Sequence, residues 1–72
     1  MTQLTLGQFR VGISFNPSNN PDVDVIKAQA AALIDMINDL PTQDGEQARL
    51  KALAMSAIED GAMWGVKAAT KQ

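Results

Sequence analysis

The chain has 72 residues, no cysteine and no histidine, and its six basic and eight acidic residues give a net charge of −2. This inventory excludes a disulfide framework and the thiolate or imidazole ligand sets of common metal sites. The acidic balance argues against binding a DNA or RNA polymer, because such binding depends on neutralising many phosphates. No segment reaches the roughly 20 apolar residues of a membrane-spanning helix, so a soluble cytoplasmic protein without membrane contact is expected.

A chain of this length forms one small domain, 1–72, that buries only about 60% of its unfolded surface. Self-association is the obvious additional support. Charge is uneven along the chain: residues 1–48 hold two basic and six acidic residues (−4), and residues 49–72 hold four basic and two acidic residues (+2). A small anion could therefore find a local basic site that a polymer could not use.

Residues 1–19 are predicted to form an extended N-terminal arm. The segment contains Pro17 and two glycines, and its apolar residues alternate at Phe9, Val11, Ile13 and Phe15. Because an isolated strand would have no partner, an arm that lies on other elements is favoured.

A first long helix is predicted at about 21–40. Asn20 suits the N-cap, Pro21 suits the first helical position, and Pro41 ends the helix. The apolar residues step alternately by three and four, which is typical of a coiled-coil type of seam. They are Val23, Ile26, Ala30, Leu33, Ile37 and Leu40.

A second long helix is predicted at about 45–70, because Asp44 and Gln47 resemble a capping box. The short link "PTQDG" predicts that the two helices pair as an antiparallel hairpin in an all-α fold. The second helix has two apolar stripes, and a hairpin can cover only one of them. The first stripe can face the first long helix, and the second then needs another subunit, so a homo-oligomer is expected. The first stripe is Leu50, Ala54, Ala57, Gly61, Trp64 and Ala68, and the second is Ala52, Met55, Ile58, Ala62, Val66 and Ala69.

The chain contains few residues of the types that act in catalysis. Histidine, cysteine and tyrosine are absent, so we expect no catalytic site and no enzyme activity. The acidic pair at 22/24 is explained by the favourable placement of carboxylates at the start of a helix, and the pair at 59/60 lacks further ligands. Neither a metal site nor a cofactor is therefore expected.

Four residues remain as candidates for ligand binding from their chemistry alone. Phe15 either clasps the start of the first long helix or stacks on a flat ligand. Lys27 is either a solvated lysine or a phosphate contact at a subunit boundary. Lys67 and Lys71 either stabilise the negative end of the second long helix or share an anion.

Two segments, "SFNPSNNPDVDVIKAQAAALIDMI" and "ARLKALAMSAIEDGAMWGVKAATK", add a family resemblance. They resemble the helical-hairpin domain shared by the phage anti-CBASS protein 2, a cyclic-oligonucleotide sponge, and Thoeris anti-defence protein 1. The resemblance covers residues 14–71 and depends on "FNPS", "IK" and the "ED", "MW" and "VKAATK" elements taken together.

The resemblance implies a homo-hexamer in the cytoplasm of an infected bacterial host. Such a protein sequesters cyclic di- and trinucleotides, for example cyclic GMP–AMP, without degrading them, and so blocks CBASS signalling. The residues implied for a cyclic dinucleotide are Phe15, Lys27, Arg10 and Asn16, and those for a cyclic trinucleotide are Lys67 and Lys71. The alternative is an oligomerising hairpin that binds a host protein through the second apolar stripe of the second long helix.

Overall fold

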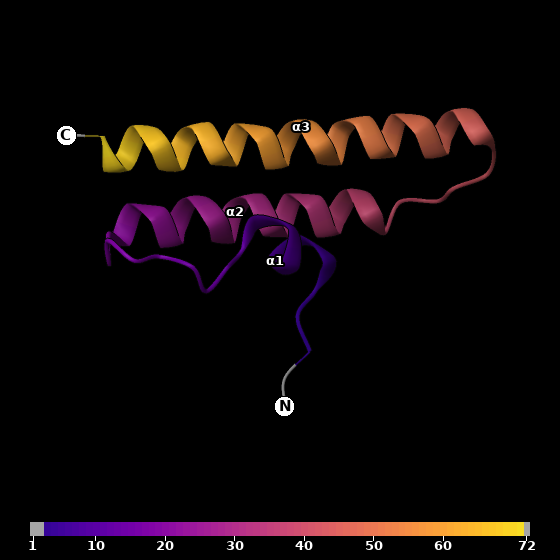
Figure 1. Ribbon diagram of the computed structural model, residues 1–72. Helices are drawn as coiled ribbons and strands as arrows, with labels where there is room; N and C mark the ends of the chain where they lie inside the picture. The colour runs from indigo at the N-terminus through magenta and orange to yellow at the C-terminus, as the bar shows by residue number, and fades with distance from the viewer. Residues whose placement is uncertain (1–2, 72) are drawn as a thin grey trace.

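The computed structural model describes residues 3–71, and these residues form three helices (Figure 1). Helix α1 spans Leu6–Val11, α2 spans Pro21–Asn38 and α3 spans Gly45–Thr70. Within the described range there is no strand, so the prediction of an all-α fold is confirmed. Figure 1 shows α2 and α3 lying side by side as an antiparallel hairpin, with α1 beside α2.

The prediction of an extended arm over 1–19 is wrong for Leu6–Val11, which is helical. The Gln8 N–H donates to Thr5 Oγ1 at 3.1 Å, and the Thr5 N–H donates to Gln8 Oε1 at 3.0 Å. This reciprocal capping box starts α1, and Gly12, in the left-handed region with φ 63°, ends it. Residues 1 and 2 of the predicted arm lie outside the described residues.

The predicted N-cap of α2 is confirmed. Asn20 Oδ1 accepts a hydrogen bond from the Asp22 N–H at 2.8 Å. The same side chain donates through Nδ2 to the Ala69 carbonyl oxygen at 3.1 Å, which ties the start of α2 to the end of α3. The helix ends at Asn38, short of the predicted limit near 40.

Asp44 caps α3, since its Oδ1 accepts a hydrogen bond from the Gln47 N–H at 2.7 Å. Gln47 Oε1 accepts in turn from the Gln43 N–H at 2.6 Å, one residue before the donor that a capping box would use. Both side chains satisfy backbone groups at the bend of the hairpin, so they hold the start of α3 in place.

A small core lies where the three helices meet. Its buried apolar residues are Val23, Ala31, Ile34, Met55 and Ala62. Helix α1 approaches α2 closely, because a Cβ on Gly7 would lie 2.1 Å from the Ala31 carbonyl oxygen. The Gly7 N–H also donates to Asp35 Oδ1 at 2.7 Å. Only glycine permits this contact between the two backbones.

The seam predicted for the first long helix is correct only in part. Leu33 and Leu40 are exposed, whereas Lys27, Ala31 and Ile34 are buried. The buried face of α2 differs from the predicted seam because α2 packs against α1 and the turn after it, in addition to α3.

The prediction that the first stripe of α3 faces α2, with the second left for another subunit, is wrong. Met55 and Ala62 of the second stripe are buried, while the first stripe is left open, with Trp64 62% exposed. Ile26 lies at van der Waals distance, 3.5 Å, from where a Cβ on Gly65 would be, so the helices pack closely there.

The molecule is thin, with Cα atoms that extend over 44 × 30 × 12 Å. Many large apolar side chains therefore stay on its outer faces, including Leu50, Leu53, Met63 and Trp64 of α3. None of the helices formed by residues 3–71 combines the length and the apolar character needed to cross a membrane.

Candidate functional site

The structure brings Phe15 and Lys27 together. Lys27 lies in the second turn of α2, and its Nζ is 5.4 Å from the centroid of the Phe15 ring. The ring is in the turn after α1 and is 71% exposed, whereas Lys27 is only 7% exposed. A cation at this distance is attracted to the face of an aromatic ring, so the two side chains form one local unit.

The buried amine of Lys27 has polar partners in the backbone. Its Nζ donates to the Gly12 carbonyl oxygen at 2.9 Å and to the Phe15 carbonyl oxygen. The interpretation of Lys27 as a solvated lysine is therefore wrong, because the turn after α1 covers it. Burial of an ammonium group is costly unless such hydrogen bonds compensate for lost water.

An open cavity of about 220 Å³, the Phe15 cavity, lies beside this pair. Its lining residues are Phe15, Asn16, Pro17, Ser18, Val23, Lys27, Val66 and Thr70. Asn16 braces the loop, because its Nδ2 donates to the Asn20 carbonyl oxygen at 2.8 Å and to Asp24 Oδ1 at 3.1 Å. The loop that carries the ring is thus tied to the start of α2.

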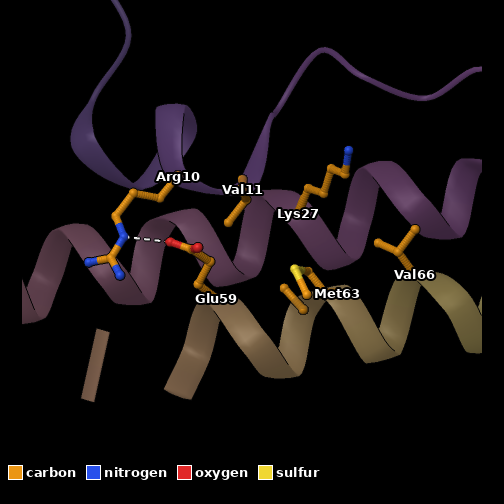
Figure 2. Close-up of a pocket in the computed structure, with 7 residues that line it drawn as sticks. Arg10, Val11, Lys27, Glu59, Met63 and Val66 are labelled. Atoms are coloured by element: carbon orange, nitrogen blue, oxygen red, sulfur yellow. Dashed lines mark hydrogen bonds and ion pairs between the residues drawn. The ribbon is translucent and has the colours of Figure 1, made fainter. Parts of the chain in front are cut away.

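A second open cavity of about 180 Å³, the Arg10 cavity, lies between α1, α2 and α3 (Figure 2). Its lining residues are Arg10, Val11, Lys27, Glu59, Ala62, Met63 and Val66. Arg10 Nε pairs with Glu59 Oε1 at 2.6 Å, and a second guanidinium nitrogen donates to Ser56 Oγ at 3.2 Å. Lys27 and Val66 line both cavities, so the two are neighbours.

The combined arrangement suits a flat ligand that carries negative charge. The cavities have apolar walls, an exposed ring at one of them, and cationic groups at Lys27 and Arg10. Aromatic rings stack on bases, and ammonium and guanidinium groups pair with phosphates. Within residues 3–71, no group of three or more His, Cys, Asp or Glu side chains could hold a metal ion.

Lys67 and Lys71 are placed elsewhere by the fold. Lys67 lies on α3 with its Nζ 5.5 Å from the Trp64 ring centroid, and both lysines are exposed. The residues that line the two cavities do not include either lysine. Trp64 is itself largely exposed, so it does not anchor the core of the single chain.

Sequence reasoning missed the partner of Arg10. In the sequence, Glu59 is recognisable only as half of the acidic pair 59/60. The Thr5–Gln8 capping box is a local signal that places Arg10 on a helix. No local signal links Arg10 to Glu59, which lies 49 residues further along the chain.

These features define an all-helical hairpin protein with an exposed ring and a buried lysine beside two cavities. Residues 6–70 match the family model of the Acb2/Tad1 hairpin domain, and the chain belongs to that family. The resemblance stated from the sequence is thereby confirmed, and the family implies an anti-defence role. No curated protein and no solved structure matches the chain.

Proposed function

We propose that the protein sequesters cyclic oligonucleotide second messengers without cleaving them, and so keeps bacterial anti-phage CBASS signalling off. The observation that carries the proposal is the exposed Phe15 ring beside the Lys27 amine, at the edge of two adjoining cavities. Its site of action would be the cytoplasm of an infected bacterium.

The chemistry of a cyclic dinucleotide fits this arrangement. Such a ligand is a small dianion with two flat bases, so it needs a surface for stacking and positive charge near its phosphates. Phe15 offers the stacking surface, and Lys27, which lines both cavities, supplies positive charge. Arg10 lines the Arg10 cavity, where it is paired with Glu59. Asn16 contributes an amide at the rim of the Phe15 cavity.

Cyclic trinucleotides would need a separate site. Lys67, with the exposed Trp64 ring beside it, is the candidate residue, and Lys71 is a weaker second one. Trp64 offers a stacking surface and Lys67 offers a cation, and the proposed dinucleotide site uses the same two kinds of group.

Assembly into a homo-oligomer, with a hexamer as the proposed state, is supported by the uncovered face of α3. Exposed apolar patches of this kind usually mark contact surfaces. The exposed residues include Leu50, Leu53, Met63 and Trp64. Native mass spectrometry would report the number of subunits and, with ligand added, the stoichiometry of binding.

Calorimetry with cyclic GMP–AMP tests the binding proposal. Phe15→Ala should weaken binding by about 10- to 100-fold, because stacking on an aromatic ring is worth about 1–3 kcal/mol per base. Phe9→Ala is the matched control, since the Phe9 ring is 73% exposed and the cavities are lined by other residues. Equal effects of the two changes, or no binding by the unchanged protein to any common cyclic di- or trinucleotide, would refute the proposal.

The fate of the ligand separates sequestration from catalysis. The chain lacks histidine, cysteine and tyrosine, and we expect the ligand to be recovered intact when the complex is denatured by heat. Chromatography of the released nucleotide would show the result. Linear or hydrolysed products that accumulate with time would identify an enzyme instead.

A second candidate function is a hairpin that oligomerises and binds a host protein. The uncovered stripe of α3, with Trp64 and Leu50 exposed, favours it. In that case Leu50→Asp should abolish protection of the phage, and Phe15→Ala should leave protection intact. The sequestration proposal expects Phe15→Ala to lose protection.

A further inference from the structure

The charged side chains around the two cavities form a small and unequal set. Arg10, Lys27 and Glu59 are the charged residues among those that line the cavities, and the rest of the lining is neutral. Two positive charges and one negative charge give the lining a net charge of +1. Because the Arg10 cavity has apolar walls, charges there interact more strongly than they would in open water.

Glu59 sets this balance, since it lines the same cavity as the cation with which it pairs. Figure 2 shows its side chain reaching from α3 toward Arg10, which comes from α1. Glu59 Oε1 is 2.6 Å from Arg10 Nε, and the two side chains are 36% and 22% exposed. One of the two cations at the cavities is therefore already compensated within the chain.

Phosphate groups differ in the charge that they bring to such a site. A phosphodiester, as in a cyclic dinucleotide, carries one negative charge, whereas a terminal phosphate carries about −1.5 to −2 at pH 7. A lining with a net charge of +1 compensates one phosphodiester but leaves part of the charge of a terminal phosphate without a partner. An uncompensated charge beside apolar walls is costly, because it has lost water and gained nothing in exchange.

We infer that Glu59 is a specificity-determining residue: by holding the lining at +1, it lets the site accept the phosphodiesters of cyclic nucleotides and reject linear nucleotides that end in a phosphate. This inference rests on the proposed function and names the competitors that the site excludes. Specificity often requires an unfavourable interaction with the wrong ligand as well as a favourable one with the right ligand. A sequestering protein needs such selectivity, because linear nucleotides in the cell would otherwise occupy its sites.

A matched pair of ligands tests the inference. The pair is cyclic GMP–AMP and its linear form, in which water has opened one phosphodiester to a hydroxyl and a terminal phosphate. Both ligands have the same bases and riboses, so they differ in ring closure and in charge. Calorimetry should show that the unchanged protein prefers the cyclic form by about tenfold or more. Equal affinities would overturn the inference and leave the proposed function in place.

Glu59→Gln, with Asp60→Asn as the matched control, isolates the charge from ring closure. Glutamine keeps the shape of the side chain and can still accept from Arg10 Nε, but it raises the net charge of the lining by one. The preference for the cyclic form should fall by about fivefold or more, because the more highly charged linear ligand gains more. Asp60→Asn removes the same charge from an exposed residue outside both linings and should leave the preference unchanged. An unchanged preference in Glu59→Gln, or an equal fall in the two variants, would overturn the inference.

The pH dependence of the unchanged protein decides the question if Glu59→Gln fails to fold. The second pKa of a terminal phosphate is about 6, so this group loses most of one charge between about pH 7.5 and pH 5.5, whereas phosphodiesters keep theirs. The preference for the cyclic form should narrow by about fivefold over this interval, and a constant preference would overturn the inference. If the unchanged protein binds no cyclic nucleotide, the proposed function fails and this inference fails with it.

Discussion

Two lysines of this hairpin make the same kind of contact at different places. Lys27 ties the turn after α1 through the Gly12 and Phe15 carbonyls. Lys51 ties the bend after α2 through the Asn38 and Leu40 carbonyls, at 3.0 and 2.6 Å, and through Thr42 Oγ1 at 2.7 Å. Each amine thus donates to carbonyl groups at or after the end of a helix.

The surroundings of the two lysines differ. Lys27 is buried, and the turn it holds presents an exposed ring beside two cavities. Lys51 is only partly buried, and the bend it holds is exposed. The same hydrogen bonds therefore stabilise a connection in one region and also order a candidate binding site in the other. The two lysines make similar hydrogen bonds, so what distinguishes them is the side chains on the segment that each one holds.

Gly7→Ala should have the largest effect on the Lys27 region. The added Cβ would lie 2.1 Å from the Ala31 carbonyl oxygen, which is backbone and cannot move aside cheaply. We expect the free energy of unfolding to fall by about 3 kcal/mol, at the upper end of overpacking effects. Urea unfolding at fixed chain concentration measures the change, and amide exchange in α1 shows whether that helix has left α2.

Gly45→Ala is the control for that change. Gly45 begins α3 at the bend, and a Cβ there would meet no described atom within 4 Å. The free energy of unfolding of the Gly45→Ala variant should stay within about 0.5 kcal/mol of that of the unchanged protein, as for most surface substitutions. A loss as large as that of Gly7→Ala would contradict the docking of α1 on α2.

Asn20→Ala should have the next largest effect. The side chain caps α2 and also bonds the Ala69 carbonyl, so the change removes a cap and a link between helices. We expect a loss of about 2 kcal/mol, against about 1 kcal/mol for Asp44→Ala, which removes the cap of α3 at the bend. Unfolding in urea measures both, and equal losses would show that the Ala69 bond contributes nothing.

Arg10→Met should affect stability less than Gly7→Ala or Asn20→Ala does. The Arg10–Glu59 pair is partly exposed, so we expect a loss of about 1 kcal/mol or less, which shrinks further in 1 M salt. Arg49→Met breaks the Arg49–Glu46 pair, whose side chains are each 60% exposed, and should cost less. Thermal unfolding at low and high salt tests the order, and a salt-independent loss at Arg10 would indicate packing rather than charge.

The sequence predicted those parts of the fold whose signals are local. Asn20 and Asp44 mark the starts of α2 and α3, and both act as N-caps in the structure. Helix α1 was missed because its alternating apolar residues suggested extended chain, although Thr5 and Gln8 form a capping box. A segment as short as Leu6–Val11 is too brief for helical periodicity to appear in the sequence.

The candidate site was predictable in its residues more than in its geometry. Phe15 and Lys27 were singled out because a ring in a polar loop is unusual and because of the family resemblance. The hydrogen bond from Lys27 Nζ to the Phe15 carbonyl oxygen was not expected, because it depends on how the turn at Gly12 folds back onto α2. The Arg10–Glu59 pair and the choice of stripe on α3 depend on how the helices pack, which residue spacing alone leaves open.

The most direct test of the account is a map of amide chemical-shift changes when the unchanged protein is titrated with cyclic GMP–AMP. We predict that the largest changes fall in residues 12–19 and around Lys27, and that residues 39–44 at the bend do not respond. Saturation should be reached with the nucleotide intact. Changes centred on the bend or on the exposed stripe of α3, or no change at all, would contradict the claim that the Phe15 turn receives the ligand.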